Sequence, residues 1–214
     1  MCGRFTRRST IEELAEEFET EIVEEQRSDP LFAPSGDCRP GSLQPVLRLS
    51  AGGERELVLM RWGFNLPIQG RMKLVFNTKS EGVGESRLWR PRFERQRCIV
   101  PASSFFEWPG KVRTEIALRG NRILGFAGLW DLWKNPKTGE AEPTFSIFTS
   151  EPNALMEKIH NRQPVILDPR EYAEWIERAE RPPAHLLRVF EAEKTVVTPA
   201  ENVSPGLFDS PHPE

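Results

Sequence analysis

A series of short, strand-like apolar runs separated by turn residues sets the strongest limit on the fold of this chain. Runs rich in β-branched and aromatic residues, bounded by Gly, Pro, Asn or Asp, are typical of β-strands. Many short strands with few helices between them favour antiparallel pairing. We therefore expect an α+β fold, a single domain built on a largely antiparallel, barrel-like β-sheet with short flanking helices. The expected strands span residues 45–49, 56–62, 98–101, 115–118, 123–130 and 144–148.

Helix signals are fewer. Thr10 and Glu13 form a capping-box pattern before apolar residues at helical spacing, which predicts a helix over about 10–20. Asp168, Pro169 and Glu171 predict the start of a helix over 169–178. Further helices are expected at 151–158, at 184–190 and at 86–95, the last broken by its proline, and residues 30–45 are expected to form a loop. We expect one domain over residues 1–203 and a loose, Pro-rich tail over 204–214.

Composition narrows the class of protein. Of the 214 residues, 38% are hydrophobic and 29% charged, which is ordinary for a soluble globular chain. No apolar run approaches the ~18 residues of a membrane helix, and no signal peptide is apparent. Cysteines at 2, 38 and 98 give neither a disulfide framework nor metal-ligand spacing. We expect no metal, no cofactor and no membrane contact, and a cytoplasmic location, nucleoid-associated in a prokaryote or nuclear in a eukaryote.

The second residue offers unusual chemistry. Because Cys2 is small, methionine aminopeptidases can remove Met1 and leave a free α-amine beside a thiol. These groups titrate near ~7.7–8.0 and ~8.5, so both are partly nucleophilic at neutral pH. Such a 1,2-aminothiol condenses with an aldehyde to a five-membered thiazolidine, and its sulfur can also attack an amide or ester. The alternative is an unremarkable residue in a frayed terminus.

Charge is unevenly distributed. The chain carries a formal charge of −3, yet residues 61–113 hold eleven basic and four acidic residues, a local charge of +7. A basic surface on an acidic protein suits a polyanion bound in one groove. A solvated surface of mixed charge is the alternative.

Six motifs occur in a particular order along the first 170 residues. They are Met1 to Phe5, Trp62-Gly63, Asn77 to Glu81, Arg97 to Trp108, Ala127 to Trp130 and His160 to Leu167. Together they resemble the SOS-response-associated peptidase (SRAP) family, the abasic-site-processing proteins. The resemblance implies an enzyme of the DNA damage response that captures abasic sites in single-stranded DNA as a covalent crosslink.

The resemblance also implies roles for individual residues. Cys2 would form the thiazolidine with the C1′ aldehyde, Asn77 would hold the N-terminus and the sugar-phosphate, and Glu107 would move protons. His160, with an ordinary pKa near ~6.5, would assist opening of the sugar ring. The residue-level alternatives are a strand-end cap for Asn77, a salt bridge for Glu107 and a satisfied histidine for His160. Autoproteolytic removal of Met1 and a weak lyase side reaction are also implied.

For DNA contact, the same resemblance and the local charge point to a larger set. Phosphate contacts are expected from basic and hydroxyl side chains, and unpaired bases are expected to stack on tryptophans unless these pack in the core. The expected DNA-binding residues are Arg4, Trp62, Arg71, Lys79, Trp108, Thr149, Ser150 and Arg162. The expected partner is single-stranded DNA containing an abasic site, bound by a monomer.

The chain departs from the family pattern at several positions. Thr78-Lys79 replaces the usual Ala-Arg, so a phosphate would meet a point charge rather than a bidentate fork. Asn161 and Gln163 replace Asp and Met near His160. Residues 104–106 replace the usual Gly-Phe-Tyr and lose a hydroxyl. These changes bear on affinity and rate.

Two other classes compete with this interpretation. Class II glutamine amidotransferases also mature to an N-terminal cysteine within Met-Cys-Gly, but their later glutamine-binding signatures are missing here. A non-catalytic module that binds single strands would need the aromatic and basic residues but not Cys2.

Overall fold

The computed structural model describes residues 2–120, 123–135, 138–179 and 181–199. Helical segments are short, and they are α1 (Ile11–Phe18), α2 (Glu24–Ser28), α3 (Arg90–Arg95) and α4 (Tyr172–Ile176), with 3-10 turns η1 (Pro30–Phe32), η2 (Met156–Lys158), η3 (Pro169–Glu171), η4 (Ala184–Leu186) and η5 (Ala192–Lys194). Strands dominate, and they are β1 (Phe5–Arg7), β2 (Ser35–Cys38), β3 (Leu43–Leu49), β4 (Arg55–Trp62), β5 (Phe64–Ile68), β6 (Arg71–Val75), β7 (Asn77–Lys79), β8 (Arg97–Ala102), β9 (Ser104–Glu107), β10 (Thr114–Leu118), β11 (Leu124–Lys134), β12 (Ala141–Ser150), β13 (Gln163–Pro164), β14 (Ile166–Leu167) and β15 (Thr195–Pro199).

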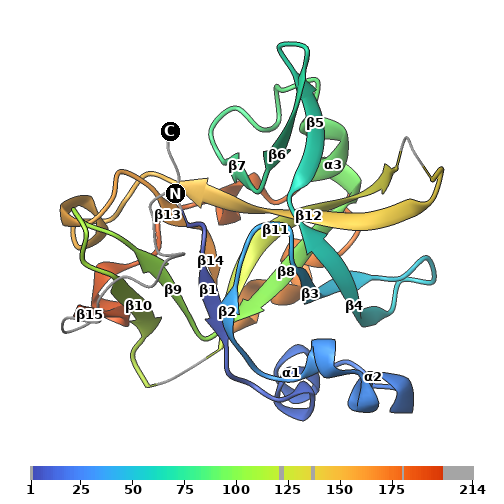
Figure 1. Ribbon diagram of the computed structural model, residues 1–214, viewed down its shortest axis with the longest axis horizontal. Coiled ribbons are helices and arrows are strands. Elements are labelled where there is room, and N and C mark those ends of the chain that lie inside the picture. The colour runs from blue at the N-terminus through green and yellow to red at the C-terminus, as the bar shows by residue number, and fades with distance from the viewer. Residues whose placement is uncertain (1, 121–122, 136–137, 180, 200–214) are drawn as a thin grey trace.

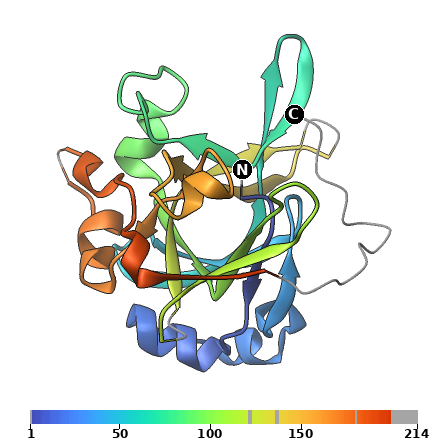
Figure 2. The same cartoon turned by 90° about the vertical axis from the view of Figure 1, so that its left-hand side faces the viewer.

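Five strands close into a barrel. The path runs from β12 through β4, β3, β8 and β11 and returns to β12, and Figure 2 looks into this ring. All of these pairs are antiparallel except β12 with β4. Beyond the ring, β7 pairs in parallel with β12, while β13 and β14 pair antiparallel with β12 and β11. The predicted largely antiparallel, barrel-like sheet is confirmed.

A second sheet carries the N-terminal segment. Its strand order is β15, β10, β9, β1 and β2. In the antiparallel pair of β1 and β9, Phe5 lies opposite Phe105, and the Phe106 amide donates to the Arg4 carbonyl. The residues before β1 therefore run alongside the residues that end β9, which brings Cys2 toward Glu107.

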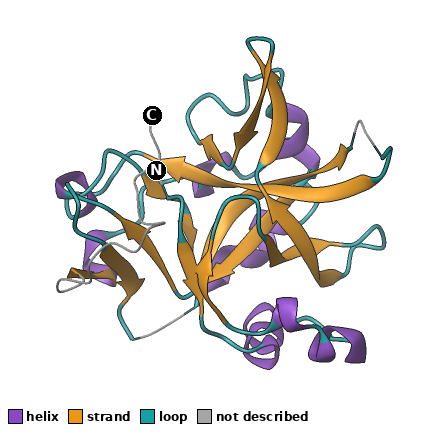
Figure 3. Cartoon of the chain, in the orientation of Figure 1, coloured by secondary structure: helices purple, strands orange, loops and turns teal. Residues whose placement is uncertain are grey.

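Two hydrophobic clusters fill the molecule. One contains Cys2, Phe5 and Trp62 together with side chains of β8, β11 and β12. The other joins α1, α3 and α4 to the sheet, with Phe18, Phe93 and Trp175 at its centre. Adjacent residues of one strand supply both clusters, because successive side chains point to opposite faces. Figure 3 shows the helices around the outside of the strands.

A hairpin of β5 and β6 projects from the body (Figure 1). It begins at Gly63, where φ is 115°, a value that side-chain-bearing residues rarely adopt. An added Cβ there would lie 2.6 Å from Leu74 Cδ1, so the turn also needs the absence of a side chain. The hairpin carries Arg71 into solvent.

All six predicted strands are present, as β3, β4, β8, β10, β11 and β12, but several other elements differ from the prediction. Strand β2 lies inside the region predicted as loop. The predicted helices at 151–158 and 184–190 are reduced to the turns η2 and η4. Pro91 lies in the first turn of α3, where a missing N–H costs nothing, so it starts that helix rather than breaking one. The capping boxes at Thr10 and Asp168 are confirmed.

The segment 204–214, predicted as a tail, lies outside the described residues. Across the part of the chain that is described, no helix is long and apolar enough to cross a membrane.

Candidate active site

Cys2 is completely buried although it precedes the first strand. Its exposed fraction is 0%, and it belongs to the cluster that also holds Phe5 and Trp62. Its Sγ lies 3.9 Å from the Arg4 carbonyl oxygen, a weak S–H donor contact. Burial raises the pKa of the Cys2 thiol, and the charge of Glu107 raises it further. The thiol is therefore held protonated beside a carboxyl group.

Glu107, the last residue of β9, is the carboxyl group in question. It is 4% exposed, and burial raises its pKa to about 7 from an ordinary value of 4.5. A carboxylate is costly to bury, because the apolar surroundings favour the neutral acid. Near neutral pH this group can therefore both give and accept a proton.

Asn77 begins β7 and contacts Cys2 directly. Its Nδ2 donates a hydrogen bond of 3.0 Å to the Cys2 carbonyl oxygen. The parallel pairing of β7 with β12 places Asn77 opposite Ile147, and the next residue is anchored by a 2.9 Å hydroxyl pair between Thr78 and Ser146. The Asn77 Oδ1 is buried and has no hydrogen-bond partner among the described residues. Asn77 therefore holds the Cys2 backbone through Nδ2, and its Oδ1 is available to accept a further hydrogen bond beside Cys2.

His160 lies between η2 and β13 and is half-buried. Its Nδ1 lies 3.0 Å from the Arg162 amide, which donates to it, and 3.3 Å from the Arg162 carbonyl oxygen. The shorter contact to the amide fits the neutral tautomer that carries its proton on Nε2. Strands β13 and β7 flank the same end of β12, where Thr149 pairs with both Pro164 and Lys79. The strand order therefore brings His160 and Asn77 to one end of the barrel.

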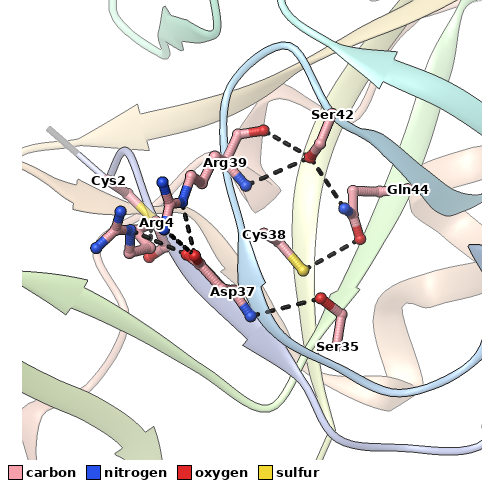
Figure 4. A network of polar contacts seen from close by, with 8 residues as sticks. All are labelled: Cys2, Arg4, Ser35, Asp37, Cys38, Arg39, Ser42 and Gln44. Atoms are coloured by element: carbon pink, nitrogen blue, oxygen red, sulfur yellow. Dashed lines mark hydrogen bonds and ion pairs between the residues drawn. The ribbon is translucent and has the colours of Figure 1, made fainter. Parts of the chain in front are cut away.

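Arg4 is held by a network that the sequence did not indicate. Its Nε lies 3.0 Å from Asp37 Oδ1, and Asp37 Oδ2 accepts a 2.6 Å hydrogen bond from Arg39 Nε (Figure 4). The Arg4 guanidinium also lies 5.6 Å from the ring centroid of Trp108. Asp37 sits in a Pro- and Gly-rich segment with no periodic pattern, so nothing in the sequence marked it as a partner of Arg4.

Arg162 makes a two-pronged ion pair with Glu81. Its two terminal nitrogens lie 2.7 and 2.8 Å from the two carboxylate oxygens. Hydrogen bonding by Arg162 lowers the pKa of Glu81. Arg162 also donates to the Thr149 carbonyl at 2.5 Å, which ties the loop after His160 to β12. Lys79, two residues before Glu81, is exposed.

The prediction that Trp62 offers a face to a base is wrong. Its ring is 0% exposed, stacks on Phe145 at a centroid distance of 6.1 Å and donates from Nε1 to the Phe76 carbonyl at 2.9 Å. The core-packing alternative therefore holds for this tryptophan. Trp108 is half-buried beside Arg4 and remains a candidate.

The two predicted hydroxyl donors are less accessible than expected. Thr149 is 0% exposed and Ser150 is 3% exposed, and the Ser150 hydroxyl donates to the Glu151 carbonyl at 3.0 Å. Ser150 and Glu81 do line a groove of about 480 Å³. A phosphate could reach Ser150 from this groove only after its hydroxyl turned away from Glu151.

The two residues near His160 that depart from the family pattern, Gln163 and Asn161, differ in their structural roles. Gln163 is 2% exposed, and its Oε1 accepts a 3.0 Å hydrogen bond from the Asn153 amide, so it supports the loop. Asn161 is exposed. Within the described ranges, no group of three or more His, Cys, Asp or Glu side chains is placed to hold a metal ion.

Comparison with known proteins finds one matching family model and relatives that carry a shared name. The family model described as SOS response associated peptidase (SRAP) matches residues 1–205. The chain is 30% identical to the abasic site processing protein YoqW of Bacillus subtilis over 98% of this chain and all of that protein. It is 28% identical to the abasic site processing protein HMCES of Xenopus tropicalis, covering 81% of this chain and 60% of that protein.

Solved structures resemble the fold. A protein from Bacteroides thetaiotaomicron superposes with a TM-score of 0.79 at 24% identity, covering 94% of this chain and 93% of that one. A protein from Bordetella bronchiseptica gives a TM-score of 0.76 at 23% identity over 94% of this chain and all of that one.

Proposed function

The chain belongs to the SOS response associated peptidase family, and we propose that it processes abasic sites in single-stranded DNA by joining them covalently to Cys2. The observation that carries the proposal is the convergence of Asn77 and Glu107 on a buried Cys2. The named relatives support the substrate class, since both YoqW and HMCES are abasic site processing proteins.

The proposed reaction starts after Met1 has been removed. The Cys2 amine attacks the C1′ aldehyde of the open sugar and expels one water, which forms an imine. The Cys2 thiol then adds across the C=N bond, so that a C–S bond forms and the nitrogen takes up a proton. The product is a thiazolidine, and the sequence of steps needs no oxidant or reductant.

Each proton in this sequence has a candidate carrier. Glu107, with its pKa of about 7, can accept the proton of the amine or thiol and return it to the departing hydroxyl. The Nε2 of His160 is suited to protonate the sugar ring oxygen during ring opening. Asn77 would fix the Cys2 backbone through Nδ2 and accept a hydrogen bond from the freed amine or a sugar hydroxyl through Oδ1.

Lys79, Arg162 and Arg4 at this end of the barrel, and Arg71 at the turn of the β5–β6 hairpin, are the proposed strand contacts. Lys79 and Arg71 are exposed, and Arg162 and Arg4 are positioned by their acidic partners Glu81 and Asp37. Trp108 is the remaining candidate for stacking on an unpaired base. A strand phosphate would have to compete with the two carboxylates.

Two side reactions belong to the same proposal. β-Elimination from the imine would cut the strand when sulfur addition is slow, giving weak lyase activity. Autoproteolytic release of Met1 would account for the peptidase in the family name.

The deciding experiment is a denaturing gel of the protein mixed with single-stranded DNA that carries one abasic site. A band resistant to boiling in detergent is expected for the native protein, whose intact mass should lack Met1, and not for Cys2→Ala. Cys38→Ser is the matched control, because Cys38 is a buried cysteine of the same cluster. No stable band with a free Cys2 would contradict the proposal, and it would favour a non-covalent binding module if the protein still bound the DNA under native conditions. An equally resistant band with Cys2→Ala would place the crosslink on another nucleophile.

A further inference from the structure

A second cavity lies at the end of the molecule where β3 ends and β8 begins. Its volume is about 290 Å³, and it shares no residue with the site around Cys2. Four arginines line it, and no carboxylate does so among the described residues. The arginines are Arg48, Arg95, Arg97 and Arg178.

The topology explains why these side chains converge. Strands β3 and β8 pair at Leu47 and Ile99, and beyond that pair β3 leads into the turn at residues 50–53. The opening is bordered by the end of α3, by Trp130 on β11 and by the chain leaving α4. Arginines from four separate segments therefore face one space.

Arg97 supplies a buried charge that has no acidic partner among the residues that the structure describes. It is 4% exposed, and its guanidinium donates to the carbonyls of Trp175, Phe93 and Glu94 at 2.5, 2.7 and 2.8 Å. Burial lowers the pKa of Arg97, but a guanidinium remains protonated at neutral pH. These carbonyl groups accept hydrogen bonds from the Arg97 guanidinium but do not neutralise its positive charge. The uncompensated charge favours binding of an anion nearby.

Arg95 and Arg178 are the two side chains free to bind that anion. Both are exposed, and neither forms an ion pair with any described residue. Within the described part of the chain, the hydrogen bonds of Arg178 are two long contacts, 3.3 Å each, to the carbonyls of Ser50 and Ala51. Arg48 differs, because it pairs with Glu56 at 2.8 Å and covers Trp130 at 4.4 Å, and so forms part of the wall.

We propose that this cavity binds a phosphate group. The planar guanidinium fork matches two phosphate oxygens, and two such forks above a buried positive charge provide both geometry and charge. The volume suits a phosphate with one attached sugar better than a large ligand. The phosphate could belong to a free nucleotide or to a DNA strand, and both present the same chemistry.

The test compares three probes on the full chain. Inorganic phosphate and dAMP are titrated by calorimetry, and an undamaged single-stranded oligonucleotide by fluorescence anisotropy. The test variant is Arg95→Gln/Arg178→Gln, and the matched control is Arg119→Gln/Lys134→Gln, which removes two exposed charges outside the cavity. We expect about tenfold weaker binding of at least one probe to the test variant and little change in the control.

A second variant keeps the test informative if the first does not fold. Ala51 is exposed and lines the cavity, so Ala51→Glu places a carboxylate beside Arg178 and should exclude phosphate. Loss of phosphate and dAMP binding identifies a free nucleotide as the source, and loss of oligonucleotide binding alone identifies a strand. The proposal is overturned if no probe binds the native protein at roughly 10 mM or below, or if the test variants bind as well as the control.

Discussion

Asn77 and Cys2 are joined by a 3.0 Å hydrogen bond from the Asn77 side-chain amide to the Cys2 carbonyl oxygen. The bond links the first described residue to the start of β7, a strand held in place by β12. The backbone of Cys2 is therefore oriented by the barrel itself, although Cys2 precedes every strand. This relationship gives the first prediction.

Asn77→Ala should slow crosslinking much more than it destabilises the fold. Loss of one hydrogen bond costs about 1 kcal/mol of stability, whereas a misplaced reacting group can cost about 100-fold in rate. Single-turnover crosslinking and thermal unfolding measure the two effects. Asn65→Ala, which changes an amide on the β5–β6 hairpin, is the control, and equal rates for the two variants would remove Asn77 from the mechanism.

Glu107→Gln should make the protein more stable at pH 8. The pKa of Glu107 is about 7 in the folded chain and ordinarily 4.5, so between these values the folded state holds a proton that the unfolded state has released. Stability therefore falls as pH rises through this window and then levels off. The variant lacks this loss, so its gain should reach about 3 kcal/mol at most above pH 7 and vanish near pH 4.5. Urea unfolding at several pH values measures it, and parallel profiles would contradict the raised pKa.

The same carboxyl should appear in the kinetics. The crosslinking rate of the native protein should change slope near pH 7, where Glu107 titrates. Glu107→Gln should react more slowly and lack that inflection. An inflection that persists in the variant would assign it to another group.

Glu81→Gln should tighten non-covalent DNA binding severalfold, because it removes the carboxylate that competes with phosphate for Arg162. Arg162→Gln should weaken binding and reduce the slope of log K against log salt by about 0.7 if it loses one phosphate contact. Anisotropy titrations in a Cys2→Ala background exclude the covalent step. Unchanged affinity in both variants would mean that the ion pair only supports the loop. Glu81→Gln should cost at most about 1 kcal/mol of stability, since the pair is partly exposed.

We expect Trp62 to contribute to the stability of the fold and Trp108 to contribute to DNA binding. Trp62→Phe loses a buried hydrogen bond and leaves a void, so we expect a loss of about 1–3 kcal/mol in stability and little change in DNA affinity. Trp108→Ala should weaken DNA binding by about 1–3 kcal/mol if a base stacks there. Unfolding and anisotropy on both variants measure this, and the opposite pattern would reverse the assignment.

The fold was predictable where local chemistry decides it. The sequence segments that form β4, β8, β11 and β12 contain enough apolar and β-branched residues to be identified as strands from local sequence alone. Both capping boxes could also be identified from the sequence. Strands β1 and β9 were missed, because three or four residues such as Phe5–Arg7 contain no periodic pattern. They exist because each completes the other's hydrogen bonds across about a hundred residues of chain.

The candidate site was predictable from motifs more than from physics. The placement of Asn77 at Cys2 depends on β7 pairing in parallel with β12, and no local signal predicts a pairing at that separation. Trp62 was misjudged because a sequence does not show which face of β4 turns inward. Asp37 was overlooked because a single carboxylate in a loop resembles any solvated charge.

Because β12 closes the barrel, the N-terminus becomes fully covered only late in the synthesis of the chain. Phe145 and Ile147 belong to the cluster that buries Cys2, so this cluster is incomplete until that strand has been made. At roughly 5–20 residues per second, about 7–30 s separate the synthesis of Cys2 from that of β12. Throughout this interval the amino terminus lacks its final covering on the ribosome, which leaves Met1 within reach of a processing enzyme before the chain folds around its second residue.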